Sequence, residues 1–188
     1  ESLIPILDKD SDIARNIAID VLNDFPKIFE GKWLDKMRGK FGFSSKFKDD
    51  YKIISGFLNL IKEEGLDYTK AFRSLIIDND EGFSFSNFEF KDSMASKKWF
   101  NSWKTRLYKE KKDIQNISKS MKKINPIYIP RNHIIEKVIN ELVQGRGINM
   151  LEKILELTEK PYTYQKDSKY FELPPNPSEE VVNTFCGT

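Results

Sequence analysis

Apolar residues recur three or four positions apart along most of this chain, which is the spacing of one face of an α-helix. No segment shows the strict alternation of a half-buried strand, and no repeat of fixed length is present. We therefore predict an all-α fold. The predicted helices cover about residues 13–22, 26–41, 46–64, 67–77, 99–108, 114–121, 132–143 and 148–155.

Polar, proline and glycine residues predict where these helices begin and end. Pro26 is expected to start the second helix, because proline is tolerated in a first helical turn. Gly65 is a candidate cap at the end of the third helix, and Asn132 is a candidate cap at the start of the seventh. Gln144 to Gly147 form a tight link, which predicts an αα-hairpin.

After Lys160 the chain becomes rich in proline and tyrosine. This composition predicts an extended, Pro-rich C-terminal tail that aromatic side chains anchor to the helices. We expect a helical domain over residues 1–160 and a tail over 161–188. A second polar connection, near residues 78–88, carries phenylalanines that are expected to pack back onto the core.

Composition fits a globular chain. Of its 188 residues, 39% are apolar and 13% aromatic, and the formal net charge is +2, so overall charge gives no reason to expect nucleic acid or a membrane. No apolar run is long enough to span a bilayer. The first residues lack an initiator methionine and resemble the middle of a packed segment. We expect Glu1 to be an internal position of a longer polypeptide.

Candidate catalytic and metal-binding groups are sparse. Neighbouring carboxylates occur at Asp49-Asp50, Glu63-Glu64, Asp78/Asp80/Glu81 and Glu179-Glu180, and we interpret them as solvated helix faces and turns. His133 is the single histidine and is expected to be packed or hydrogen-bonded. Gly145-Arg146-Gly147 is interpreted as a helix connection, since it follows a helix and is too short to cradle a phosphate.

The segment from Lys97 to Lys123 is strongly basic, with ten basic residues against two acidic ones. It is interleaved with Trp99, Phe100, Trp103 and Tyr108, a combination that could bind nucleic acid or an acidic protein. Helical spacing turns the aromatic residues inward and leaves the lysines outside. We interpret the segment mainly as a basic solvated face.

Cys186 is the single cysteine, so a disulfide within the chain and a Cys/His metal cluster are both excluded. It stands in the closing sequence Asn183-Thr184-Phe185-Cys186-Gly187-Thr188. A thiol so near the end is accessible to a partner on another molecule or on another part of a larger protein.

The last third carries a resemblance to a known family. The chain reads Asn125-Pro126-Ile127-Tyr128-Ile129-Pro130-Arg131-Asn132, then a helix pair, Pro161-Tyr162, and the terminal Phe185-Cys186-Gly187-Thr188. It resembles the C-terminal end of the selenoprotein O (YdiU) family. Asp67-Tyr68-Thr69 and Trp99 through Arg106-Leu107 are also similar to the family in order and spacing, so the resemblance covers nearly the whole chain.

The resemblance implies a protein-kinase-like (pseudokinase) fold that binds ATP with Mg²⁺ and transfers AMP to protein Ser, Thr or Tyr hydroxyls. The family's nucleotide- and metal-binding residues would lie N-terminal to this chain, so no catalytic residue and no cofactor are assigned here. The chain would be part of the kinase-like second lobe and its extension. Its expected partners are the missing N-terminal kinase-like region and the protein substrates.

In such proteins the C-terminal cysteine acts as a redox switch, which assigns a redox role to Cys186 by resemblance. Asn125, Pro126, Tyr128, Arg131 and Asn132 are interpreted as a structural motif, with a direct substrate or nucleotide contact by Arg131 as the alternative. Pro130 departs from the family's common leucine. The implied location is the bacterial cytoplasm, or the mitochondrion in a eukaryote.

Two functions remain open from the sequence. One is the regulatory and scaffolding C-terminal portion of a protein adenylyltransferase, without activity of its own. The other is an independent all-α interaction module that binds nucleic acid or an acidic partner through residues 97–123. We expect no membrane association and no nucleic-acid binding.

Overall fold

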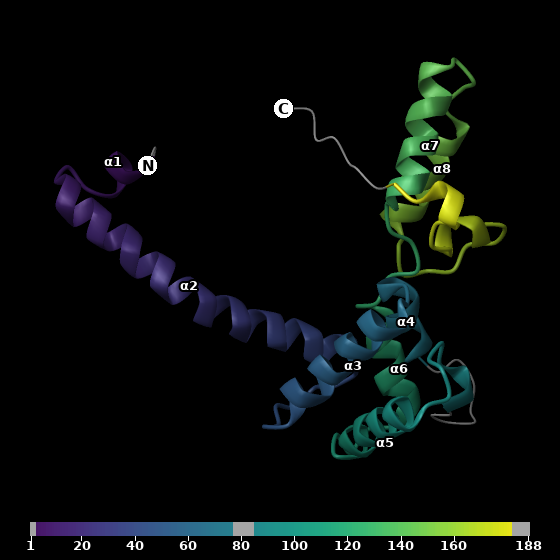
Figure 1. Cartoon of the computed structure of the whole chain (residues 1–188), viewed down its shortest axis with the longest axis horizontal. Helices are drawn as coiled ribbons and strands as arrows, with labels where there is room; N and C mark the ends of the chain where they lie inside the picture. Colours follow the sequence, from purple (N-terminus) through teal and green to yellow (C-terminus); the bar gives the residue numbers. More distant parts are fainter. Residues whose placement is uncertain (1–2, 77–84, 182–188) are drawn as a thin grey trace. The chain divides into compact units, whose positions relative to one another are not determined.

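A computed structural model describes residues 3–76 and 85–181, and over these ranges the chain is helical and contains no strand (Figure 1). The prediction of an all-α fold is therefore confirmed. The chain divides into two compact units, residues 1–38 and 39–188. The α-helices are α1 (Ile4–Leu7), α2 (Ser11–Lys40), α3 (Asp50–Glu64), α4 (Tyr68–Ser74), α5 (Met94–Tyr108), α6 (Ile114–Lys122), α7 (Asn132–Val143) and α8 (Asn149–Glu159).

Unit 1 contains α1 and most of α2, which is one helix of 30 residues. The prediction that a new helix begins near Pro26 was wrong, because Pro26 lies inside α2. Proline removes one intrahelical hydrogen bond, yet the residues on both sides keep helical geometry. Much of the predicted apolar face is exposed in the structure. Exposed apolar residues of α2 are Ile13, Ile17, Ile19, Val21, Leu22, Phe25, Ile28 and Phe29.

The core of unit 2 is built from aromatic rings. Phe41 makes edge contacts with Phe57 and Phe72 at centroid distances of 5.1 and 5.2 Å, and Trp99 stacks on Trp103 at 5.8 Å. Such ring pairs add to the free energy gained from burial alone. The prediction that the α5 aromatic residues face inward is confirmed for Trp99, Phe100 and Trp103, whereas Tyr108 is 58% exposed.

Both buried indoles of this core have hydrogen-bond acceptors. Trp99 Nε1 donates to the carbonyl of Ile53 at 2.7 Å, and Trp103 Nε1 donates to the carbonyl of Phe41 at 3.0 Å. A buried N–H without an acceptor would cost folding free energy. These two bonds fix α5 against α3 and against the chain that follows α2. Phe88, in the connection after α4, packs on Phe100 at 4.8 Å, as predicted for that connection.

Helix ends follow the sequence signals in part. Gly65 caps α3 in the left-handed conformation with φ +66°, and Asp67 caps α4 by accepting from the Lys70 amide. The predicted cap at Asn132 was wrong by one position. Arg131 is the N-cap, since its extended backbone (ψ 139°) leads into a helix that begins at Asn132.

The last third forms a second, mainly aliphatic core. Helices α7 and α8 contribute to one buried cluster and are joined by residues 144–148, with positive φ at Gly145 and Gly147 (Figure 1). The chain after Pro161 packs onto this hairpin and contains the 3-10 helices η2 (Lys169–Glu172) and η3 (Pro177–Glu179), so it is not extended throughout. Residues of this core are Ile127, Tyr128, Ile134, Val138, Ile154, Leu157 and Phe171.

Candidate functional site

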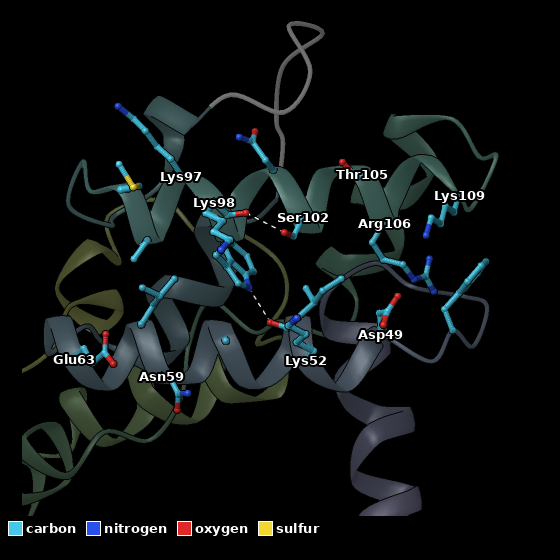
Figure 2. A pocket seen from close by; sticks show the side chains of 18 residues that line it. Asp49, Lys52, Asn59, Glu63, Lys97, Lys98, Ser102, Thr105, Arg106 and Lys109 are labelled. Atoms are coloured by element: carbon cyan, nitrogen blue, oxygen red, sulfur yellow. Dashed lines mark hydrogen bonds between the residues drawn. The ribbon is translucent and has the colours of Figure 1, made fainter.

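An open groove of about 1080 Å³ runs between α3 and α5 (Figure 2). The two helices point in opposite directions along it. Glu63 of α3 and Lys97 of α5 lie at one end, and Asp49 and Lys109 lie at the other. The groove is lined by side chains from both helices over most of their length, so it is a feature of the helix pair rather than of a loop.

The helices approach closely at the floor of the groove because α3 carries a glycine there. A Cβ atom on Gly56 would lie 3.1 Å from Cδ1 of Trp99, which is tighter than ordinary packing. Trp99 is 7% exposed and forms part of the floor with Ile53 and Leu60. The floor is therefore apolar and rigid, since Trp99 is also hydrogen-bonded to Ile53.

The rim of the groove is mixed but mostly basic. Lys52 lines it from α3, and Lys98 and Lys109 line it from α5. Lys97 points away from α3 in Figure 2 and is paired with Asp92. The carboxylates of the rim, Asp49 and Glu63, stand near its two ends.

A buried ion network closes one end of the groove. Arg106 Nε donates to Asp50 Oδ1 at 2.6 Å, and its Nη1 donates to Glu110 Oε1 at 2.6 Å. Nη2 donates to the carbonyl of Ser45 at 2.8 Å. The guanidinium lies 4.3 Å from the centroid of Phe43 and 4.2 Å from that of Phe47. The side chains of all three charged residues are at most 2% exposed.

This network corrects two interpretations made from the sequence. Asp50 is not part of a solvated carboxylate pair, because it is fully buried and its Oδ2 accepts from the Phe47 amide. Arg106 and Glu110 are not part of the solvated basic face, because both side chains are buried and form an ion pair with each other. Their spacing of four residues was a usable signal for this ion pair, although Glu110 lies in the turn after α5. The contact between Arg106 and Asp50 spans 56 positions and leaves no such signal.

Glu110 has an unusually acidic side chain. Burial alone would raise its pKa, but hydrogen bonds from Ser44, from Arg106 and from the amide and hydroxyl of Ser45 outweigh burial and lower the pKa to about 2. Hydrogen bonds to the charged form stabilise that form. Glu110 is therefore ionised at neutral pH and holds the loop of residues 44–45 against α5.

The motif from Asn125 to Asn132 lies at the junction between the two cores of unit 2. Asn125 is fully buried, and its amide donates to the carbonyl of Lys40 at 2.9 Å and accepts from Lys40 Nζ at 3.2 Å. Its own carbonyl accepts from Arg73 at 3.2 Å. Pro126 follows directly, and the next two amides, of Ile127 and Tyr128, both donate to the carbonyl of Pro161.

Arg131 binds a carboxylate within the same unit. Its two terminal nitrogens donate to the two oxygens of Asp67 at 2.7 and 2.9 Å, and Nη2 also donates to the carbonyl of Glu172 at 3.0 Å. Burial would raise the pKa of Asp67, but hydrogen bonds from Arg131 and the Lys70 amide leave that pKa below its ordinary value. The hydroxyl of Tyr128 accepts from the Gln165 amide at 3.0 Å.

Comparison with known proteins decides the family. A family model described as protein adenylyltransferase SelO matches residues 5–159 of this chain. The chain belongs to the SelO family. Among its relatives are proteins named protein nucleotidyltransferase YdiU, from Clostridium botulinum at 35% identity and from Bacillus thuringiensis at 36%. Each alignment covers the whole of this chain but 37% and 38% of the relative.

The described part of this SelO-family chain offers no metal centre. Over residues 3–76 and 85–181, no group of three or more His, Cys, Asp or Glu side chains converges. Nor is any helix there long and apolar enough to cross a bilayer. Glu63 stays on the groove rim, and Glu179 accepts from the Asn176 amide within η3. The carboxylates of Asp78, Asp80 and Glu81 lie outside the described residues.

His133 of the SelO-family chain is buried at the start of α7, 6.3 Å from the ring of Tyr170. Burial lowers its pKa, with a smaller opposing effect from Glu179. Gly145-Arg146-Gly147 is the α7/α8 link, as predicted. Asn132 is exposed on the first turn of α7. Cys186, the predicted redox residue, lies outside the described residues.

Proposed function

We propose that this chain is the C-terminal, regulatory and scaffolding part of a protein adenylyltransferase. The intact protein would transfer AMP from ATP to Ser, Thr or Tyr hydroxyls of other proteins, in the bacterial cytoplasm. One observation carries the proposal: the SelO model matches residues 5–159, while the chain spans little more than a third of its YdiU relatives. In this proposal the nucleotide-binding residues belong to the part of the relatives that the chain does not cover.

The described residues fit a scaffold better than a nucleotide site. Mg²⁺ bound with a nucleotide is held through carboxylates beside the phosphates. Among residues 3–76 and 85–181, no group of three or more His, Cys, Asp or Glu side chains that could hold a metal ion comes together. Arg131 of the motif is held by Asp67, and Lys40, outside the motif, donates to Asn125. These contacts support a structural role for the motif. No step of AMP transfer is assigned to the residues of this chain.

The redox role of Cys186 forms part of the same proposal. A disulfide between Cys186 and a second cysteine in the uncovered part would form one S–S bond and pass two electrons and two protons to an oxidant such as oxidised glutathione. Because the thiol is carried on the same polypeptide, its effective concentration favours such a bond. Thiol counts of the intact protein before and after oxidation test this. Equal counts, or equal loss in Cys186→Ser, would rule out the switch.

The main experiment uses ATP labelled in the α-phosphate, Mg²⁺ and a mixture of acceptor proteins. We expect the intact protein to label acceptors or itself, and γ-labelled ATP to give no transfer. The present chain alone is expected to be inactive. Transfer by this chain alone would refute the assignment of the nucleotide site to the uncovered part. An inactive intact protein, beside an active Bacillus relative, would refute the adenylyltransferase proposal.

A further inference from the structure

We propose that the groove between α3 and α5 is a docking site for an amphipathic helix with acidic flanks, supplied by another protein. The proposal does not depend on AMP transfer. It rests on the length of the groove, on its apolar floor, and on the sign and placement of the charges along its rim.

The shape of the groove suits a third helix. Asp49 and Glu63 stand near its two ends, and the helical chain between them spans roughly 21 Å at 1.5 Å per residue. A partner helix of about 14 residues has the same length. Two antiparallel helices leave a seam into which the ridge of a third can pack, a common mode of peptide recognition.

The groove presents apolar surface along its length. Ile53, Leu60 and Trp99 form the floor. Exposed apolar side chains stand on its lining, with Met94 at 87% exposure from α5 and Phe47 at 38% beside α3. Exposing a methionine side chain to water is unfavourable, and a flexible methionine adapts readily to a bound side chain. An apolar stripe at positions i, i+4 and i+7 of the partner would cover these residues.

The lysines on the rims of the groove favour a partner helix with acidic residues on both sides of its apolar stripe. Lys52 and Lys98 lie on opposite rims, and in residues 3–76 and 85–181 neither has a carboxylate within ion-pair distance. The Lys109 Nζ lies 5.5 Å from the ring centroid of Phe47. Its charge adds to that of Lys98 on the α5 side of the groove. Each rim pair would contribute modestly to affinity, because exposed ion pairs are screened. Their main effect is to favour an acidic partner over a basic one.

A helix fits this groove better than a nucleic acid does. Arginine is the side chain that most often binds phosphate with two hydrogen bonds, but Arg106, which lines this groove, is buried and held by Asp50, Glu110 and Ser45. Asp49 and Glu63 near the ends would repel a phosphate backbone running the length of the groove. A helix can place its acidic residues beside Lys52 and Lys98 and leave uncharged residues beside Asp49 and Glu63, whereas a nucleic acid carries a phosphate at every nucleotide.

The test measures fluorescence anisotropy of a labelled, end-capped peptide of about 14 residues, with leucines at i, i+4, i+7 and i+11 and glutamates beside them. We expect binding in the micromolar range that weakens several-fold as ionic strength rises from about 0.15 M to about 1 M. Lys52→Glu with Lys98→Glu should weaken binding roughly tenfold or more. Ala95→Trp, which fills the groove without changing its charge, should also weaken it. Circular dichroism checks that each variant is folded.

Matched controls are Lys112→Glu and Lys119→Glu, two exposed lysines of the basic segment that do not line the groove. Their binding should stay within about twofold of the unchanged chain. Equal binding of a scrambled peptide, or of one with lysines in place of glutamates, would overturn the proposal. So would tighter, Lys98-dependent binding of a single-stranded oligonucleotide. Self-association through the groove, or loss of peptide binding in the intact longer protein, would likewise overturn it.

Discussion

Glu110→Gln removes one charge from the buried network at the end of the groove and keeps the size of the side chain. Burial opposes ionisation of Glu110, but its hydrogen bonds from Ser44, Arg106 and Ser45 lower the pKa from 4.5 to about 2. A difference of about 2.5 units corresponds to about 3 kcal/mol of folding free energy at neutral pH. The glutamine side chain would also place an NH₂ donor where the carboxylate of Glu110 accepts hydrogen bonds from Ser44, Ser45 and Arg106. We expect the variant to be less stable by about 3 kcal/mol at pH 7.

The stability difference between the unchanged chain and the Glu110→Gln variant should depend on pH. A folded pKa below the unfolded value means that the contribution is fully present above about 4.5 and is lost as pH falls through about 2. The difference in the free energy of unfolding between the unchanged chain and the Glu110→Gln variant should therefore shrink as pH falls from about 4.5 to about 2. Urea unfolding at several pH values measures the difference. A Trp33→Phe background leaves Trp99 and Trp103, both in unit 2, as the fluorescent reporters.

Glu156→Gln is the matched control, because that carboxylate is 60% exposed and paired with Lys153 on the surface of α8. Its effect should stay below about 1 kcal/mol at every pH. If Glu110→Gln were as stable as the unchanged chain, or if the difference between them did not change down to pH 2.5, the account of the network would be wrong.

Three further changes test the packing around the two cores. Gly42→Ala should cost roughly 2–4 kcal/mol in urea unfolding, because its φ is +80° and the new Cβ would lie 2.6 Å from Cγ2 of Ile117. Arg131→Lys should cost roughly 1.5–3 kcal/mol by the same assay, because an ammonium cannot reproduce the two-pronged contact with Asp67. Burial lowers the pKa of His133, so the melting temperature should fall as pH drops below about 6.5, and His133→Gln should reduce that fall.

Each of these changes has its own comparison. Gly145→Ala shares the positive φ of Gly42 but meets no atom within 4 Å, so it should cost only about 1 kcal/mol. Equal costs for the two glycines would exclude the clash with Ile117. Arg146→Lys, in the exposed α7/α8 link, should be neutral. A His133→Gln variant with an unchanged pH profile would show that another group titrates.

The sequence predicts this fold well where burial has helical periodicity. Helical spacing correctly predicts that Ile54, Phe57 and Ile61 of α3 are buried, but not that Tyr51 is 50% exposed. The cap at Gly65 is also correct. The sequence wrongly predicts a helix start at Pro26, which lies inside α2. The loss of one hydrogen bond at proline does not end a helix whose flanking residues keep helical geometry. Such a failure concerns one backbone position and leaves the fold class intact.

The candidate site was harder to predict, because its charged groups are fixed by partners far away in the chain. Arg106 and Lys98 belong to one basic segment and both line the groove, yet Arg106 is buried in an ion network and Lys98 is exposed. Composition cannot separate them. The distinction depends on Asp50, Phe43 and Phe47, which reach Arg106 through tertiary structure.

The junction formed by residues 125–131 has a consequence for the dynamics of unit 2. It joins an aromatic core to an aliphatic core of seven buried residues. Asn125 is hydrogen-bonded to Lys40, and Arg131 is bound to Asp67 and to the carbonyl of Glu172. Such modules open as separate cooperative units. In native-state hydrogen exchange, the amides of α7 and α8 should therefore exchange together, at a lower free energy than those of α3 and α5. Arg131→Lys should speed exchange in α7 and α8 and leave α3 unchanged.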